Sequence, residues 1–181
     1  MAKYCLVYVL EGKAKTYHIA LTKEISKKFK VKNPSKRVAP HLTIKEIGNI
    51  TNKKQLLEVI SKIDEVSKKI KKFNVQLNGI NCFGKDVIFL DVKKTKRLMK
   101  NYEKVYLDLI KVKFIPKISK FEGKNMHFHA TLCAFDIKDK FDKIMQYLAK
   151  KNITYKISFN NFVLKKKVKN IWKPIKIWRL K

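Results

Sequence analysis

Apolar and polar positions along the first part of the chain follow two periods, one typical of strands and one of helices. Residues 4–10 are aromatic and β-branched and end at a Glu-Gly pair, which predicts a buried strand. Over residues 17–30 apolar residues recur near helical spacing among lysines, which predicts an amphipathic helix that Asn33-Pro34-Ser35 ends. A second strand is expected to begin at Pro40 and to end at Gly48.

The same reasoning assigns elements to the rest of the chain. It predicts helices over residues 52–72, 96–112 and 138–151, and strands over residues 73–83, 86–92, 126–135, 154–164 and 175–180. The strands before and after Gly84-Lys85 are expected to form a hairpin, and residues 116–125 a loop. No linker divides the chain, so residues 1–181 are expected to form a single two-lobed domain.

Two short motifs stand out because histidine is rare in this chain. There are four histidines, and two of them begin the triplets His41-Leu42-Thr43 and His129-Ala130-Thr131. Chance alone would give roughly 0.15 H-x-T triplets in a chain of this composition. Side chains alternate along a strand, so each motif places an imidazole and a hydroxyl on one face.

Both motifs begin similar stretches of sequence. From His41, and again from His129, the pattern predicts a strand, a helix and two further strands, with Asn78 and Asn160 at matching places. The repeat predicts two similar α+β lobes related by a pseudo-twofold axis. The two His-Thr pairs would then face each other across a central cleft.

Two facing histidines suit an in-line displacement at phosphorus. One imidazole can activate the nucleophile while the other protonates the leaving oxygen, because histidine exchanges protons near neutral pH. The hydroxyls of Thr43 and Thr131 can donate to the non-bridging phosphate oxygens, where negative charge develops. This chemistry needs no metal ion or other cofactor.

The charge points to a polyanionic partner such as RNA. The chain has 44 Lys and Arg against 14 Asp and Glu, a net charge of +30. Nearly all of these basic residues are lysine, so an AT-rich coding sequence or a hot habitat is an alternative explanation for the positive charge. Lys36 and Arg37 precede the first motif and are candidate phosphate contacts. The basic run at residues 165–169 is expected at a turn between two strands, either along an RNA backbone or in solvent.

The cysteines and the lengths of the apolar stretches indicate the compartment in which the protein is expected. Cys5, Cys82 and Cys133 are scattered and form no CxxC pair, which favours buried thiols in a reducing compartment. No stretch approaches the ~18 apolar residues of a membrane span, and the first residues do not match a secretory signal. We therefore expect a cytoplasmic monomer without a membrane partner.

The motifs resemble those of a known family. PHLTIKEIG, from Pro40 to Gly48, and HATL, from His129 to Leu132, resemble the two H-x-[ST] motifs of the 2H phosphoesterases. Within that superfamily the chain is most similar to the 2'-5' RNA ligases, also known as RNA 2',3'-cyclic phosphodiesterases. The likeness continues through residues 73–92 and 159–180, so it covers nearly the whole chain in order and spacing.

This resemblance implies a LigT-like fold, in which antiparallel sheets with flanking helices form two α+β lobes around a cleft. It implies metal-independent hydrolysis of RNA 2',3'-cyclic phosphate ends, tRNA among them, to 2'-phosphomonoesters, with 2'-5' ligation as a second activity. The family's usual assignment makes His41 the acid and His129 the base. The chain departs from the family at Phe128, where proline is usual, and at Phe135 and Asp136, where a basic residue is frequent.

Several alternatives remain open from the sequence. His127 lies on the same strand face as His129, so with His41 these residues could form a three-histidine zinc site; otherwise His127 is a candidate substrate contact. His18 is interpreted as a residue on the surface of its helix. The chain could also be an RNA-binding protein with little turnover, or a phosphoesterase of non-RNA cyclic nucleotides.

Overall fold

The computed structural model describes residues 2–117 and 122–181. The strands are β1 (Ala2–Val9), β2 (His41–Ile50), β3 (Phe73–Phe83), β4 (Val87–Val92), β5 (His129–Ala134), β6 (Thr154–Phe159), β7 (Asn161–Val168) and β8 (Ile171–Arg179). The helices are α1 (Gly12–Phe29), α2 (Lys53–Lys68), α3 (Lys96–Leu109) and α4 (Phe141–Ala149), with short 3-10 turns η1 (Pro34–Lys36), η2 (Gly123–Asn125) and η3 (Lys138–Lys140). Part of the loop predicted over residues 116–125 lies outside the described residues.

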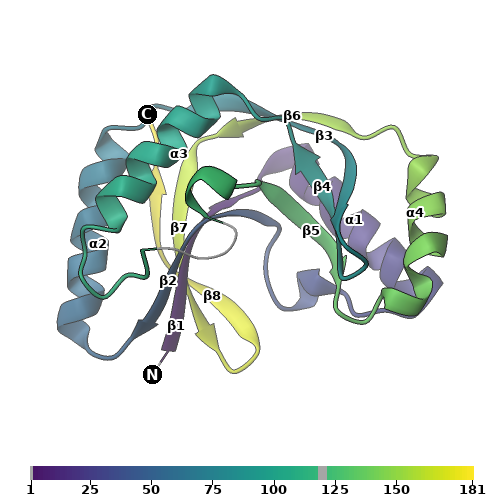
Figure 1. The fold of residues 1–181 in the computed structure, drawn as a ribbon, viewed down its shortest axis with the longest axis horizontal. Helices are drawn as coiled ribbons and strands as arrows, with labels where there is room; N and C mark the ends of the chain where they lie inside the picture. Colours follow the sequence, from purple (N-terminus) through teal and green to yellow (C-terminus); the bar gives the residue numbers. More distant parts are fainter. Residues whose placement is uncertain (1, 118–121) are drawn as a thin grey trace.

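The strands in these two ranges form two antiparallel sheets of four. Sheet A has the order β2-β1-β7-β8, and sheet B has the order β5-β4-β3-β6. The two H-x-T strands, β2 and β5, occupy the same edge position in their sheets and pack against each other. This arrangement confirms the predicted α+β fold of two lobes related by a pseudo-twofold axis (Figure 1).

The repeat seen in the sequence is correct for the motif strands but not for every strand that follows. It paired residues 86–92 with the last strand, yet β4 is the second strand of sheet B and β8 is the outer strand of sheet A. The strand equivalent to β4 by position is β1, which precedes the first motif. Local sequence order could not reveal this, because the strands of each sheet come from both halves of the chain.

Several predicted element boundaries differ from the structure. The strand expected over residues 154–164 is divided at Asn160, where the chain leaves sheet B as β6 and enters sheet A as β7. β8 begins at Ile171 and includes Pro174, which the outer edge tolerates because no strand lies there to need its missing N–H. α1 begins at Gly12, a turn and a half before the predicted start, and Ala14 is buried in that added segment.

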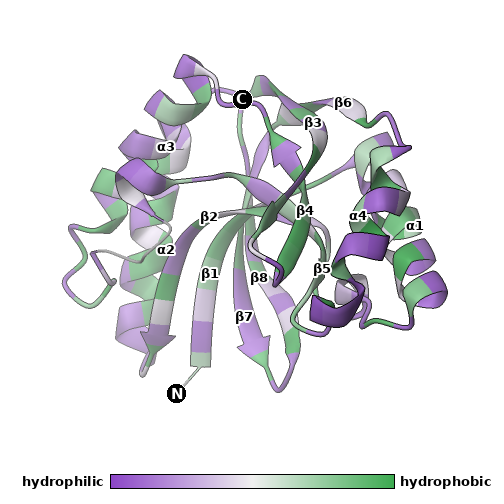
Figure 2. Ribbon diagram, turned by 45° about the vertical axis from the view of Figure 1, so that its right-hand side comes forward, coloured by the Kyte–Doolittle hydropathy of each residue, from purple (hydrophilic) through white to green (hydrophobic). Residues whose placement is uncertain are grey.

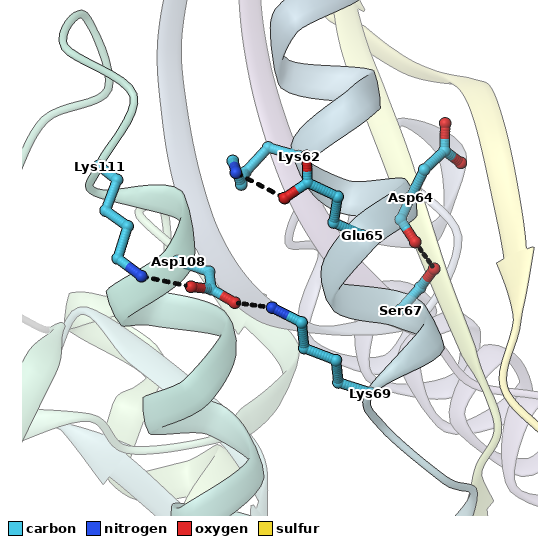
Figure 3. Close-up of polar contacts among 7 residues, drawn as sticks. All are labelled: Lys62, Asp64, Glu65, Ser67, Lys69, Asp108 and Lys111. Carbon is cyan, nitrogen blue, oxygen red and sulfur yellow. Dashed lines mark hydrogen bonds and ion pairs between the residues drawn. The ribbon is translucent and has the colours of Figure 1, made fainter.

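Each sheet is covered on one face by a pair of helices. α2 and α3 lie against sheet A and contact each other, while α1 packs on β5 of sheet B and α4 lies beside α1 (Figures 1 and 2). Asp108 on α3 joins the pair at its surface by accepting from Lys69 at 3.1 Å and from Lys111 at 2.7 Å (Figure 3). Such exposed ion pairs contribute little free energy, so apolar burial holds the helices on the sheets.

The face of sheet A that lies opposite helices α2 and α3 carries part of the candidate site. Leu6 and Tyr8 of β1 point into the main core, whereas Cys5 and Val7 point to the other face and form a small second cluster with Val163. Because β1 is an inner strand with apolar side chains on both faces, its sequence is a continuous apolar run rather than an alternating one. The second face carries His41 and Thr43 at its edge.

Two expectations drawn from the composition concern the burial of the cysteines and the presence of membrane-spanning segments. Cys5 and Cys133 are buried and Cys82 is half-buried, all as free thiols, so the prediction of burial holds for two of the three. Within residues 2–117 and 122–181, no helix combines the length and the apolar character that a membrane crossing requires.

Candidate active site

The first motif lies at the edge of sheet A. His41 pairs with Val9 across the strand ladder and Thr43 pairs with Val7, so both motif side chains lie on the uncovered face. The His41 imidazole donates from Nδ1 to the Ala39 carbonyl at 2.9 Å. A carbonyl can only accept, so Nδ1 carries the proton and Nε2 of the neutral ring is left free to take one.

The second motif repeats this arrangement at the edge of sheet B. The His129 imidazole donates from Nδ1 to the His127 carbonyl at 2.8 Å, which again leaves Nε2 free. In the ladder with β4, His129 pairs with Asp91 and Thr131 with Phe89. The two motifs therefore occupy equivalent strand positions, but their ladder neighbours differ in chemistry.

The structure brings the two motifs together where β2 and β5 meet. One cavity of about 280 Å³ is lined by His41 and Thr43, and another of about 300 Å³ by His41, Thr131 and Arg37. His129 is close enough to His41 for their charges to interact. His41 thus lies at the junction of two cavities, with one threonine of each motif beside it. Of the two predicted phosphate contacts before the motif, Arg37 lines a cavity and Lys36 lies exposed outside both.

A polar network supports the second motif. Nε2 of His127 is 2.8 Å from Oδ1 of Asp91, and Asn81 donates to Oδ2 of the same carboxylate at 3.0 Å. The rings of Phe83 and Phe89 lie 4.9 and 5.0 Å from the ring of His129. The network holds the His127 backbone, whose carbonyl orients His129. His127 thus orients His129 through its carbonyl, and its contact with substrate stays a prediction.

Lys165 is a site residue that sequence reasoning missed. It is 3% exposed, lines the cavity of His41 and Thr43, and donates at 3.4 Å to the Ala39 carbonyl that also orients His41. The other buried lysine of the described residues, Lys45, forms an ion pair with Glu122, but none of the described carboxylates pairs with Lys165.

The position of Lys165 follows from strand alternation. It belongs to the basic run at residues 165–169, which was predicted at a turn, but only Lys169 of this run lies in the turn between β7 and β8. β7 extends to Val168, so Lys165 shares a strand face with the buried Val163 and pairs with Cys5. Continuing the alternation of β7 into the basic run would have predicted this inward orientation. Burial lowers the pKa of Lys165 to about 8.

His18 is not on the helix surface, as the sequence was interpreted. It is 2% exposed, and neither ring nitrogen has a hydrogen-bond partner among the described residues. Its side chain packs beside the backbone of Ala130 and Thr131 in the second motif. The buried residues of α1 are Ala14, His18, Leu21, Thr22 and Ile25, whereas Ile19, an apolar residue within the predicted helix, is exposed. Burial lowers the pKa of His18 to about 4.

The surroundings of the two motif histidines differ in charge. Burial, and after it the ammonium of Lys165, lowers the pKa of His41 to about 3. Burial also lowers the pKa of His129, but its hydrogen bond to the His127 carbonyl and, more weakly, the Asp91 carboxylate oppose that effect. Both imidazoles are therefore neutral near pH 7 in the unliganded protein, and His129 is the easier of the two to protonate.

The three-histidine metal site considered from the sequence is not formed. Among residues 2–117 and 122–181, no three His, Cys, Asp or Glu side chains come together in a way that could hold a metal ion. Nδ1 of both motif histidines is taken up by a carbonyl, and Nε2 of His127 by Asp91. The geometry favours proton transfer by the two free Nε2 atoms.

Comparison with known proteins agrees with this geometry. The family model described as "2'-5' RNA ligase superfamily" matches residues 18–170, which include both H-x-T motifs. The chain belongs to this superfamily. The resemblance of its two motifs to those of the 2H phosphoesterases is thereby confirmed. No curated protein sequence matches the chain.

Solved structures share the superfamily fold over nearly their whole length. The TT0787 protein of Thermus thermophilus matches with a TM-score of 0.65 at 13% identity, covering 98% of this chain and 97% of that one. E. coli LigT complexed with NADP+ matches with a TM-score of 0.60 at 14% identity, covering 99% and 97%. E. coli LigT complexed with 3'-AMP matches with a TM-score of 0.58 at 15% identity, covering 99% and 98%. At sequence identities this low, the likeness to these structures shows that the chain shares their fold.

Proposed function

We propose that this protein hydrolyses RNA 2',3'-cyclic phosphate ends to 2'-phosphomonoesters without a metal ion. The observation that carries the proposal is the pair of histidines on facing edge strands, each with Nδ1 held by a carbonyl and Nε2 free. Two such nitrogens supply the base and the acid that an in-line displacement at phosphorus requires. Ligation of RNA ends through a 2'-5' bond uses the same displacement with a 5'-hydroxyl in place of water, and the 3' oxygen leaves as before; it is the second activity we propose to test.

The proposed reaction follows from the positions of the side chains. Water attacks phosphorus on the side opposite the 3' oxygen, a neutral imidazole takes its proton, and an imidazolium protonates the 3' oxygen as the P–O3' bond breaks. The hydroxyls of Thr43 and Thr131 are placed beside His41 to donate to non-bridging oxygens. The ammonium of Lys165 adds positive charge on the first-motif side, where it would balance the charge of the phosphate.

The charges around the histidines support one assignment of acid and base. The family resemblance makes His41 the acid and His129 the base. However, burial and after it the Lys165 ammonium strongly disfavour a proton on His41, whereas at His129 the hydrogen-bonded His127 carbonyl and, more weakly, the Asp91 carboxylate oppose the effect of burial. We therefore assign His129 as the general acid and His41 as the general base in the hydrolytic direction.

The cavity walls support RNA as the substrate class. Basic residues line both cavities: Lys3, Lys165 and Lys167 in one, and Lys32, Arg37 and Lys167 in the other. Trp172 lines both cavities as well and offers a surface for base stacking. Phosphate contacts by such residues provide affinity for RNA without sequence preference.

The test is direct incubation of the purified protein with adenosine 2',3'-cyclic phosphate and with an oligonucleotide that ends in a cyclic phosphate, each with and without EDTA. We expect 2'-phosphate products from both substrates and the same rate in EDTA. Binding of the oligonucleotide without turnover would instead indicate an RNA-binding protein on this fold. Turnover of other cyclic nucleotides alone would remove RNA as the substrate. Loss of activity in EDTA with recovery in zinc would overturn the metal-independent mechanism.

A further inference from the structure

Phe135 is held in an unfavourable position for a bulky apolar residue. Its side chain is 84% exposed, the largest exposed fraction among the exposed large apolar residues of the described chain. Its φ is 74°, in the left-handed region that glycine tolerates and bulky residues rarely adopt. Neither burial nor backbone preference explains a phenylalanine here, and residues kept in such conformations tend to cluster at ligand-binding sites.

The backbone around Phe135 is fixed on both sides. Its N–H donates to the Asp86 carbonyl at 2.9 Å, which ties it to the β3–β4 hairpin. The next residue, Asp136, accepts from the Lys32 N–H at 2.8 Å, which ties the same turn to the segment before η1. The ring is therefore presented from a rigid turn. An aromatic side chain with only two rotatable bonds loses little entropy when a ligand packs on it.

The ring lies at a cavity that belongs to the candidate site. Phe135 lines the cavity of about 300 Å³ together with His41 and Thr131, one residue from each motif. Lys32 and Arg37 also line this cavity, and no carboxylate does among its described residues. The other cavity at His41 contains Glu46 in its wall and so offers a less favourable environment for an anion.

We propose that Phe135 forms a nucleobase-stacking subsite for the terminal nucleotide of an RNA whose phosphate lies between His41 and Thr131. The class of ligand follows from what surrounds the ring. A polyanion that also carries flat aromatic groups can pair its charges with the side chains of Lys32 and Arg37 and stack an aromatic group on the exposed phenyl face. The inference rests on the proposed function for the position of the phosphate, and it adds the place of the base.

The experiment measures binding separately from turnover. The probe is a short RNA oligonucleotide ending in a 2'-phosphate, the proposed product, with its affinity measured by fluorescence anisotropy. One base-aromatic stack contributes about 1 to 3 kcal/mol, so Phe135→Ala and Phe135→Gly are each expected to weaken binding about 5- to 150-fold. Phe135→Trp is expected to keep the affinity. The same oligonucleotide with an abasic terminal residue is expected to bind wild type and Phe135→Ala equally.

Two further measurements separate the stacking role from a structural one. Phe135→Gly removes the unfavourable φ, so its thermal unfolding temperature is expected to rise above that of wild type while its affinity falls. The matched control is Leu57→Ala, which removes another exposed apolar side chain from α2, and it is expected to leave binding unchanged. Wild-type affinity in both Phe135→Ala and Phe135→Gly would overturn the subsite, as would an equal loss with the abasic probe.

The outcome is distinguishable from failure of the proposed function. Base-dependent binding that needs Phe135, in a protein that turns over no cyclic phosphate, would support the subsite and remove the catalytic proposal. Turnover of adenosine 2',3'-cyclic phosphate with the same KM in wild type and Phe135→Ala would support catalysis and overturn the subsite.

Discussion

His41 and His129 are oriented by the same contact, in which Nδ1 donates to the carbonyl of the residue two positions earlier. The distances are 2.9 Å to Ala39 and 2.8 Å to His127. Each ring is therefore fixed in the same tautomer by its own strand. The difference between them comes from their neighbours, since His41 lies beside Val9 in the ladder and near Lys165, whereas His129 lies beside Asp91.

Replacing either motif histidine should remove activity without unfolding the protein. We expect His41→Ala and His129→Ala each to lower the turnover of a 2',3'-cyclic phosphate by at least about 100-fold, the usual effect of losing a general acid or base. Circular dichroism and thermal unfolding serve as folding controls. Turnover within a few-fold of wild type in either folded variant would exclude that histidine from catalysis.

The two imidazoles should titrate in a definite order. We expect His129 to take up a proton at higher pH than His41, because burial and then the Lys165 ammonium lower the pKa of His41 to about 3, whereas the His127 carbonyl and, more weakly, Asp91 oppose the effect of burial on His129. The Cε1–H resonances in an NMR pH titration measure both pKa values, with single-histidine variants for assignment. In Lys165→Met the pKa of His41 should rise. The reverse order of titration would restore the assignment of His41 as the acid.

Lys165 should bind phosphate rather than stabilise the fold. Its ammonium is buried without a carboxylate partner among the described residues, so Lys165→Met should leave the free energy of unfolding equal or higher. The same variant should bind inorganic phosphate and a nucleoside 2'-phosphate at least about tenfold more weakly, since charged hydrogen bonds contribute about 1.5 to 3 kcal/mol.

The matched control for this prediction is Lys173→Met, which removes an exposed lysine of β8 that lines neither cavity at His41. Calorimetry of phosphate binding and urea denaturation measure the two effects. Destabilisation of Lys165→Met with unchanged phosphate affinity would assign Lys165 a structural role instead.

His18 should make the protein less stable in mild acid. The pKa of His18 in the folded protein, about 4, lies below the ordinary value of 6.5. Between these pH values the unfolded chain therefore binds a proton at His18 that the folded chain does not bind. Stability from this residue is thus lost as the pH falls from 6.5 to 4, by on the order of 3 kcal/mol. His18→Leu should shrink the difference in urea midpoint between pH 7 and pH 4.5. An unchanged difference would show that burial of His18 does not affect its protonation.

The lysine excess should act through RNA phosphates. Affinity for longer RNA should fall steeply with salt, with a log-log slope on the order of −0.7 per phosphate neutralised. Turnover of a mononucleoside cyclic phosphate should depend far less on salt, because only the cavity residues contact it. The measurement is binding and turnover between about 50 and 200 mM salt. Weak, salt-independent RNA binding would mean that the +30 charge reflects composition rather than a partner.

The sequence by itself predicted most of the strands and helices, the histidine and threonine of each motif, and the two-lobed class of fold. These features are local: alternation fixes which residues share a strand face, and the triplets at His41 and His129 carry both candidate groups within three residues. The strand at residues 154–164 shows the limit, because its pattern is continuous while the chain changes sheets at Asn160.

Only the tertiary structure decided how residues far apart in the chain combine. Lys165 reaches the carbonyl that orients His41, and Phe135 reaches the cavity of His41, because β7 and β5 lie near β2 in space. His18 is buried because α1 packs on β5. The spacing of apolar residues in α1 did not by itself show which side of the helix makes this contact. Burial and the approach of charges across the two sheets set the protonation of these groups, and both depend on packing that no local pattern encodes.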